Sequence, residues 1–198
     1  LSPLVPGSTA LESLEPGSLE ALSMLAPPGV IERRYAVALA LRALKVGGEL
    51  IVLAPKDKGG SRLAKELTAF GTDPQETFKA HHRICVVARP EAITGLDEAL
   101  EAGAAREGPD GLWTQPGVFS WDRVDPGTAL LAELLPVLSG EGADFGCGVG
   151  VLSLGLYACG QKPAPAEEAE ASAATAGKAG AQTDVNQSMR VTRVENRN

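Results

Sequence analysis

The chain of 198 residues is 44% hydrophobic and 22% charged, which suffices for the core of one domain, or of one domain and part of another. Its formal net charge of -7 excludes a broad basic footprint for nucleic acid, so any RNA contact must come from a local basic patch. Three scattered cysteines without a C-x-x-C pair argue against disulfides and a zinc site, and no apolar run reaches the roughly 20 residues of a membrane span.

The N-terminal region begins as loop and continues as a helix. Residues 1–30 are rich in Pro, Gly and Ser, and they lack the basic and apolar segments of a secretory signal, so we expect a cytoplasmic protein with reduced thiols. Within them, residues 19–25 form either a short buried strand or one helical turn. Apolar residues at helical spacing predict a helix over residues 31–45, with Arg33 among its solvent-facing residues and Gly47-Gly48 as its C-cap.

An apolar run and a basic loop follow. Residues 49–54 are of the length and β-branching expected of a buried parallel strand. The next loop carries Lys56 and Lys58 and leads to Arg62, with Ser61 as a good N-cap for a further helix. Because α/β proteins bind ligands at the carboxyl ends of strands, these three basic side chains are candidates for phosphate or RNA contact. The pattern itself favours a solvated turn with charged side chains over such a contact, and the loop lacks the Gly-Lys-Ser/Thr ending of a Walker A motif.

Two further strands flank a histidine pair. Residues 78–80 and 83–88 are predicted to be strands, and the second, with its run Ile84-Cys85-Val86-Val87, is expected to be buried. His81 and His82 are the only histidines of the chain, and as neighbours on a strand they would point to opposite faces. Without further ligands at suitable spacing they indicate a strand edge, and we expect no metal site.

The middle of the chain changes character. Residues 91–111 contain a short acidic amphipathic helix and a Gly- and Pro-rich loop, which we interpret as the joint between two domains. Beyond this joint, Phe119 and Trp121 are expected to pack, or to stack on a cofactor ring or base. Pro126 suits the first turn of a helix that extends over residues 129–138. Its leucines predict a core-facing stripe of Leu130, Leu131, Leu134, Leu135 and Leu138.

The sharpest motif occupies residues 142–154. Asp144 and an apolar residue are followed by three alternate glycines, Gly146, Gly148 and Gly150, and then by residues suited to a helix. In such a strand–turn–helix pattern the glycines permit positive φ or the close approach of a ligand, and the helix N-terminus offers free N–H groups. The spacing differs from the G-x-G-x-x-G of dinucleotide-binding folds. The pattern favours a loop that cradles a nucleotide-like cofactor over a plain structural turn.

The C-terminal part departs from what a cofactor-binding unit requires. A βαβ unit continues with a second strand and an acidic residue about 20 positions on, which holds the ribose hydroxyls. Residues 161–198 are instead rich in Ala, Glu and Gln. They predict a low-complexity, disordered tail, or at best a marginal helix over residues 166–176, that cannot complete a sheet.

Four motifs occur together in the second half of the chain: Pro116-Gly117-Val118-Phe119-Ser120, Asp125-x-Gly127-Thr128, Leu130-Leu131 and Asp144-x-Gly146-Cys147-Gly148-x-Gly150-Val151-Leu152. In this combination they resemble the bacterial RsmC-type small-subunit rRNA guanine-N2 methyltransferases, which are class I S-adenosylmethionine-dependent enzymes. Upstream, residues 44–50 and 55–59 look like the late part of that family's N-terminal domain. The resemblance covers about residues 20–154.

This resemblance implies a Rossmann-like α/β methyltransferase fold with two tandem domains. The first is degenerate, does not bind the cofactor and supports RNA binding or folding; the second is catalytic. We accordingly expect four regions: an N-terminal α/β domain over residues 1–90, the joint over residues 91–111, the start of the catalytic domain over residues 112–160 and the tail over residues 161–198. Leu1 is not an initiator residue, which suggests a missing or processed N-terminus.

The resemblance also implies the site. The residues expected to hold S-adenosylmethionine are Asp144, Gly146, Cys147, Gly148, Gly150, Phe119 and Thr128, and small-subunit ribosomal RNA is the expected partner of Lys56, Lys58 and Arg62. The family's catalytic signature, Asn-Pro-Pro followed by an aromatic residue, does not occur in the sequence. We therefore expect a chain that is inactive in guanine methylation by itself.

The sequence also suggests two other functions. A non-catalytic α/β module that binds RNA or a protein through the basic loop is the alternative. A nicotinamide-dependent oxidoreductase is disfavoured by the glycine spacing. The sequence does not indicate an oligomeric state.

Overall fold

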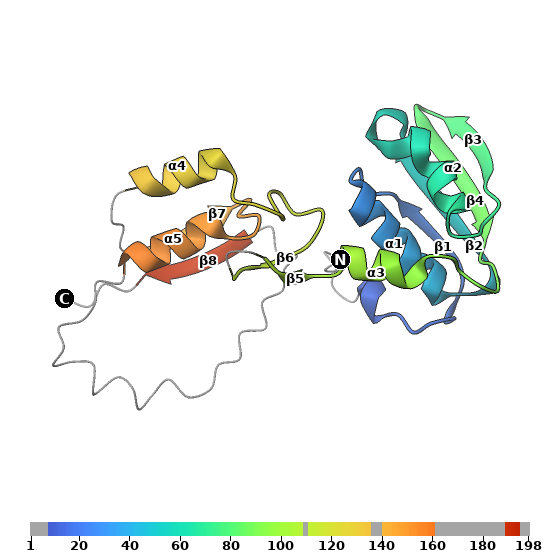
Figure 1. The fold of residues 1–198 in the computed structure, drawn as a ribbon, viewed down its shortest axis with the longest axis horizontal. Coiled ribbons are helices and arrows are strands. Elements are labelled where there is room, and N and C mark those ends of the chain that lie inside the picture. The colour runs from blue at the N-terminus through green and yellow to red at the C-terminus, as the bar shows by residue number, and fades with distance from the viewer. Residues whose placement is uncertain (1–7, 109–110, 136–139, 161–188, 195–198) are drawn as a thin grey trace. The chain divides into compact units, whose positions relative to one another are not determined.

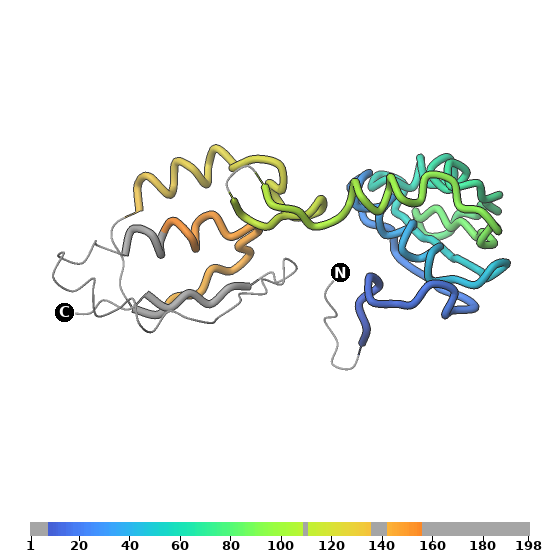
Figure 2. Tube along the Cα trace, turned by 60° about the horizontal axis from the view of Figure 1, so that its bottom comes forward, coloured from blue at the N-terminus to red at the C-terminus, as the bar shows by residue number. Residues whose placement is uncertain are grey.

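The computed structural model describes residues 8–108, 111–135, 140–160 and 189–194 (Figure 1). Its contacts divide the chain into two compact units. Unit 1 comprises Leu1–Arg106 with Gln115–Gly117, and unit 2 comprises Glu107–Thr114 with Val118–Asn198. Both units mix helices and strands, and Figure 2 traces their backbones, so the predicted α/β class is confirmed.

Unit 1 is built on a four-stranded sheet with the order β1-β2-β4-β3. Its strands are β1 (Leu19–Leu25), β2 (Leu44–Pro55), β3 (Gln75–Lys79) and β4 (His82–Ala88). β1 pairs with β2 in parallel, whereas β2 with β4 and β4 with β3 pair antiparallel. Residues 19–25 therefore form a strand and not a helical turn, but the expected burial is wrong, because no residue of β1 is fully buried.

The helices of unit 1 are η1 (Leu11–Ser13), α1 (Val30–Ala43), α2 (Ser61–Thr68) and α3 (Leu96–Gly103). α1 contacts β2, α2 contacts β4, and α3 packs against α1. α3 thus belongs to the packing of unit 1, and the contact boundary between the units follows it, after Arg106.

The sheet buries one face against the helices. On β2, Leu50, Val52 and Ala54 are fully buried, whereas Ile51 and Leu53 between them are partly exposed. This alternation follows from the two-residue period of a strand. Alanines dominate the buried residues of α1, whose small side chains allow a close approach to its neighbours.

Two of the expected helix caps in unit 1 are wrong. Gly47 and Gly48 do not cap α1, which ends at Ala43; they lie inside β2, where they exchange backbone hydrogen bonds with Arg89 at 2.9 and 2.8 Å. Pairing with a distant segment, which a local motif does not reveal, decides this position. The N-cap of α2 is Gly60 rather than Ser61, whose backbone is already helical.

Cys85 provides a test of this core. It is fully buried on β4, where burial, and secondarily the Glu76 carboxylate, raises its pKa to about 11 against the opposing effect of Arg83. Because the raised pKa keeps the thiol protonated near neutral pH, we expect iodoacetamide to leave Cys85 unmodified in the folded chain and to alkylate it in urea. Mass spectrometry of the modified peptides measures this, with the half-buried Cys147 as the internal comparison. Alkylation of Cys85 at the rate of Cys147 without urea would contradict the buried placement.

Unit 2 contains smaller elements. β5 (Arg106–Glu107) and β6 (Trp113–Thr114) form one two-stranded sheet. The helices are α4 (Pro126–Leu134) and α5 (Val151–Gly160), which contact each other. A second sheet pairs β7 (Gly140–Phe145) antiparallel with β8 (Met189–Val194).

The expectation that the tail cannot complete a sheet is wrong for β8. The segment Met189-Arg190-Val191-Thr192-Arg193-Val194 is rich in the β-branched residues that favour strands, and its place in an otherwise polar tail concealed it. The remaining tail, including the marginal helix over residues 166–176, lies outside the described residues.

The expectation that the leucines of α4 face a core is wrong for the residues that the structure describes. Leu130, Leu131 and Leu134 are 57%, 46% and 72% exposed, and α4 has no buried residue. Helical periodicity predicts which side chains share a face, but burial needs an element to cover that face. Leu138 lies outside the described residues.

Candidate functional site

The glycine motif forms the turn between β7 and α5. Gly146, Gly148 and Gly150 take φ values of 76°, 56° and 87°, a region that side chains with a Cβ rarely adopt. The amide N–H of Gly150 donates to the carbonyl of Cys147 at 2.8 Å, which closes the turn. α5 begins at the next residue, so the turn delivers the chain to a helix N-terminus.

Asp144 is held by a residue that the sequence did not single out. The Ser153 Oγ donates to Asp144 Oδ2 at 2.7 Å, and Ser153 is only 4% exposed. The bond joins the carboxyl end of β7 to the first turn of α5. This hydrogen bond fixes the orientation of the Asp144 carboxylate beside the glycine turn. The second carboxylate oxygen, Oδ1, takes no part in it.

Phe119 lies beside the turn, although its ring does not pack as expected. Its carbonyl oxygen is 3.3 Å from the position a Cβ on Gly148 would take. Its side chain is 70% exposed, so it is a projecting ring rather than a packing residue. Ser120, with φ of 57°, turns the backbone after it.

Thr128 takes part in the N-terminal cap of α4. Its amide N–H donates to Asp125 Oδ2 at 3.0 Å, and its hydroxyl lies 3.4 Å from the same oxygen. Asp125 is the N-cap of α4, and Pro126 occupies the first turn as predicted. The polar atoms of Thr128 therefore serve the helix cap, which makes it the weakest of the candidate cofactor residues.

A shallow hollow adjoins the turn. Trp121 lines it together with Val149 and Val151, which flank Gly150, and with residues of the β5–β6 segment. The half-buried Trp121 thus contributes an apolar wall to this part of unit 2.

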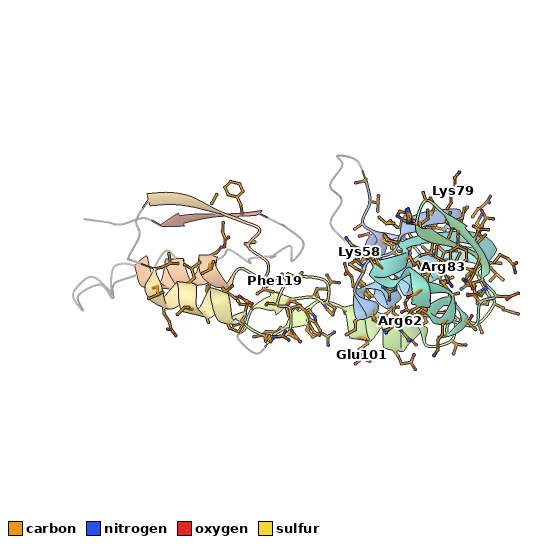
Figure 3. All side chains as sticks on the ribbon, turned by 90° about the horizontal axis from the view of Figure 1, so that it is seen from above. Lys58, Arg62, Lys79, Arg83, Glu101 and Phe119 are labelled. Carbon is orange, nitrogen blue, oxygen red and sulfur yellow. The ribbon has the colours of Figure 1, made fainter. Side chains whose placement is uncertain are left out.

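The second candidate site is the basic loop after β2. Lys56 and Lys58 lie in the turn Lys56–Gly60, and Arg62 lies in the first turn of α2; all three side chains are exposed. Lys58 and Arg62 are among the side chains labelled in Figure 3. Gly59 has φ of 98°, and a Cβ there would collide with the guanidinium of Arg33.

The expectation that Arg33 faces solvent is wrong. It is 1% exposed, and its Nε and Nη2 donate to the two carboxylate oxygens of Glu66 at 2.6 and 2.7 Å. Its Nη1 donates to the carbonyls of Pro27 and Pro28 at 2.9 and 2.8 Å. The guanidinium of Arg33 thus joins the loop after β1 to α2. It also lies against Gly59, and so supports the backbone of the basic loop.

The expectation that the two histidines are neighbours at a strand edge is wrong, because only His82 belongs to a strand, and that strand, β4, is an inner one. His82 starts β4, whereas His81 lies in the turn with φ of 62°. Among the described residues no group of three or more possible metal ligands comes together.

Comparison with known proteins adds independent information. A family model, described as methyltransferase small domain, matches residues 111–196. The chain is 42% identical over 120 residues to the ribosomal RNA small subunit methyltransferase C of Pseudomonas entomophila, covering 57% of this chain and 36% of that protein. For the protein of the same description from Vibrio vulnificus the identity is 31% over 144 residues, covering 70% of this chain and 41% of the other.

A solved structure shows the same fold. The 16S rRNA N2 methyltransferase RsmC of T. thermophilus, in complex with AdoMet and guanosine, matches with a TM-score of 0.56 and 22% identity, over 75% of this chain and 43% of that one. These findings confirm the resemblance to the RsmC-type methyltransferases and the methyltransferase fold. The chain spans about 36–41% of the length of the curated relatives cited above. No helix in the described part of the chain is long and apolar enough to cross a membrane.

Proposed function

We propose that this chain, which is similar in sequence and fold to the RsmC-type small-subunit rRNA methyltransferases, carries the S-adenosylmethionine-binding loop of a cytoplasmic enzyme that methylates a guanine amino group in that RNA. The observation that carries the proposal is the turn between β7 and α5. Its three glycines at positive φ leave the turn free of side chains at these positions, and a helix N-terminus follows it.

The roles of the loop residues follow from their positions. Gly146, Gly148 and Gly150 would allow the methionine part of S-adenosylmethionine to approach the backbone, and Asp144 would accept a hydrogen bond from its amino group. Cys147, half-buried between two glycines, would contribute backbone contacts. When bound, the cofactor supplies a methyl group on a sulfonium, which an amine nitrogen can attack. The exposed ring of Phe119 is available for stacking beside the loop.

The transfer step needs groups that this sequence does not contain. In the resembled family, an Asn-Pro-Pro signature followed by an aromatic residue accepts hydrogen bonds from the guanine amine, and no such sequence occurs here. We therefore propose that the chain binds the cofactor without catalysing methyl transfer by itself.

Unit 1 would correspond to the degenerate N-terminal domain, and unit 2 to the start of the catalytic domain. In unit 1 the equivalent ends of β1 and β2 are occupied by the Arg33–Glu66 pair, which supports a role other than cofactor binding. The exposed Lys56, Lys58 and Arg62 support RNA contact by this unit. A non-catalytic RNA-binding module is the second candidate, and the same basic loop favours it.

Isothermal titration calorimetry separates these functions. We expect the chain to bind S-adenosylmethionine and not NAD, and to incorporate no labelled methyl into small-subunit RNA. Absence of S-adenosylmethionine binding would remove the cofactor proposal and leave the RNA-binding module. Measurable methyl incorporation would show that the transfer step does not require the Asn-Pro-Pro signature.

A further inference from the structure

The tip of the β3–β4 hairpin lies against the basic loop after β2. The amide N–H of Lys56 donates to the carbonyl of His81 at 3.0 Å. Pro55 of β2 is in register with His82 of β4, and Lys79 of β3 is in register with the same residue. Lys79 and His81 are exposed. Backbone pairing thus places basic side chains from two separate segments at one end of the sheet.

This end is the one at which the parallel strands finish. β1 and β2 both run toward it, and α2 starts from it after the turn Lys56–Gly60. In open α/β sheets the loops at the carboxyl ends of the strands bind ligands. The hairpin tip reaches the same end because β4 runs antiparallel to β2 and begins there.

The cations at this end are available to a partner. Four of them form no ion pair within the described residues: Lys56, Lys58, Arg62 and Lys79. By contrast, Arg83 is paired with Glu76. The exposed acidic residue within the turn is Asp57. Positive charge therefore predominates at this end of the sheet, although the formal net charge of the whole chain is -7.

The backbone of the tip adopts a conformation that its residues disfavour. Ala80 and His81 have φ values of 47° and 62°, positions that hairpin turns usually fill with Asn and Gly. The Nδ1 of His82 lies 2.8 Å from the carbonyl of Ala80, which helps to hold the turn. Such strain persists where the surroundings determine the conformation, as the pairing with Lys56 does here.

We propose that the hairpin tip extends the basic loop into one surface for RNA phosphates, with Lys79 as an additional contact and His81 as a neighbouring donor. This inference rests on the proposed function, which already assigns Lys56, Lys58 and Arg62 to RNA. The exposed groups of this surface are ammonium, guanidinium and imidazole. Protein interfaces are depleted in lysine, whereas RNA supplies the phosphates that these groups bind, so RNA fits the surface better. Figure 3 shows Lys58, Arg62 and Lys79 on this unit.

Fluorescence anisotropy with a labelled small-subunit rRNA hairpin tests the proposal on the full chain. Lys79→Ala and Lys58→Ala are each expected to weaken binding about fivefold at about 100 mM salt, and to lower the slope of log K against log salt by about 0.9. Lys45→Ala is the matched control, because Lys45 is the second residue of β2, at the opposite end of this strand, and pairs with Glu20 at 2.7 Å. It should leave binding unchanged, and Lys79→Arg should retain it.

The outcomes distinguish the two levels of the proposal. If Lys79→Ala binds as the parent does while Lys58→Ala is weakened, the hairpin has no part in the surface and the proposed role of the loop stands. If both variants behave like Lys45→Ala, the RNA role of the loop fails as well. If polyglutamate competes as well as unlabelled RNA, the surface serves an acidic protein, and the RNA assignment is overturned.

Discussion

Arg33→Ala is expected to lower the free energy of unfolding of unit 1 by about 3–5 kcal/mol, because it removes one partner of a buried ion pair. The guanidinium is 1% exposed and bonds both oxygens of Glu66. Its loss leaves a carboxylate without its cation and leaves the carbonyls of Pro27 and Pro28 without a donor. Urea denaturation measures the change, and trypsin should also cleave faster after Lys56 or Lys58, since the loop above the guanidinium loses its support.

Two further variants identify the cause. Arg33→Met combined with Glu66→Leu should be less destabilising than Arg33→Ala, because no unpaired charge remains. Arg34→Ala removes a neighbouring arginine that lies 5.5 Å from the ring centroid of Phe70, and it should cost about 1 kcal/mol or less. If Arg33→Ala and Arg34→Ala unfold at the same urea concentration, the ion pair does not have the assigned role.

Arg33 also shows where prediction from sequence ends. Its place on α1 follows from helical periodicity, but the burial of its charge depends on Glu66, which is 33 positions away. Ser153 was missed for a related reason: its hydroxyl resembles any helical serine until the fold brings Asp144 within 2.7 Å. Polar contacts between distant segments leave no periodic signal.

The apolar strands were easier to recognise. The β-branched runs within β2 and β4 are continuous enough to predict strands without a partner. Their order in the sheet was not predictable, because it depends on the antiparallel pairing of β4 with β2. The glycine turn was the best predicted feature of the candidate site. Three alternate glycines predict a backbone with positive φ, and all three glycines adopt it. Its use for a cofactor stays a prediction.

Gly148→Ala is expected to weaken S-adenosylmethionine binding by at least about tenfold, or about 1.4 kcal/mol. Gly148 has φ of 56°, and an added Cβ would lie 3.3 Å from the Phe119 carbonyl oxygen. A side chain there strains the turn and occupies space between the loop and its neighbour, so the backbone can no longer approach the cofactor. Calorimetric titration of the variant against the parent chain measures the loss.

Gly155→Ala supplies the matched control for this substitution. Gly155 lies within α5, its φ is not positive, and among the described residues an added Cβ would meet no atom within 4 Å beyond its chain neighbours and the backbone of its own helix. Alanine in a helix interior is favoured over glycine by roughly 0.5–1 kcal/mol, so this variant should be slightly more stable and should bind the cofactor as the parent does. The same substitution is thus expected to weaken cofactor binding at Gly148, in the turn, and to leave it unchanged at Gly155, in the helix. Equal loss of binding in both variants would show that any added methyl disturbs unit 2, and the cofactor role of the glycine turn would lose its support.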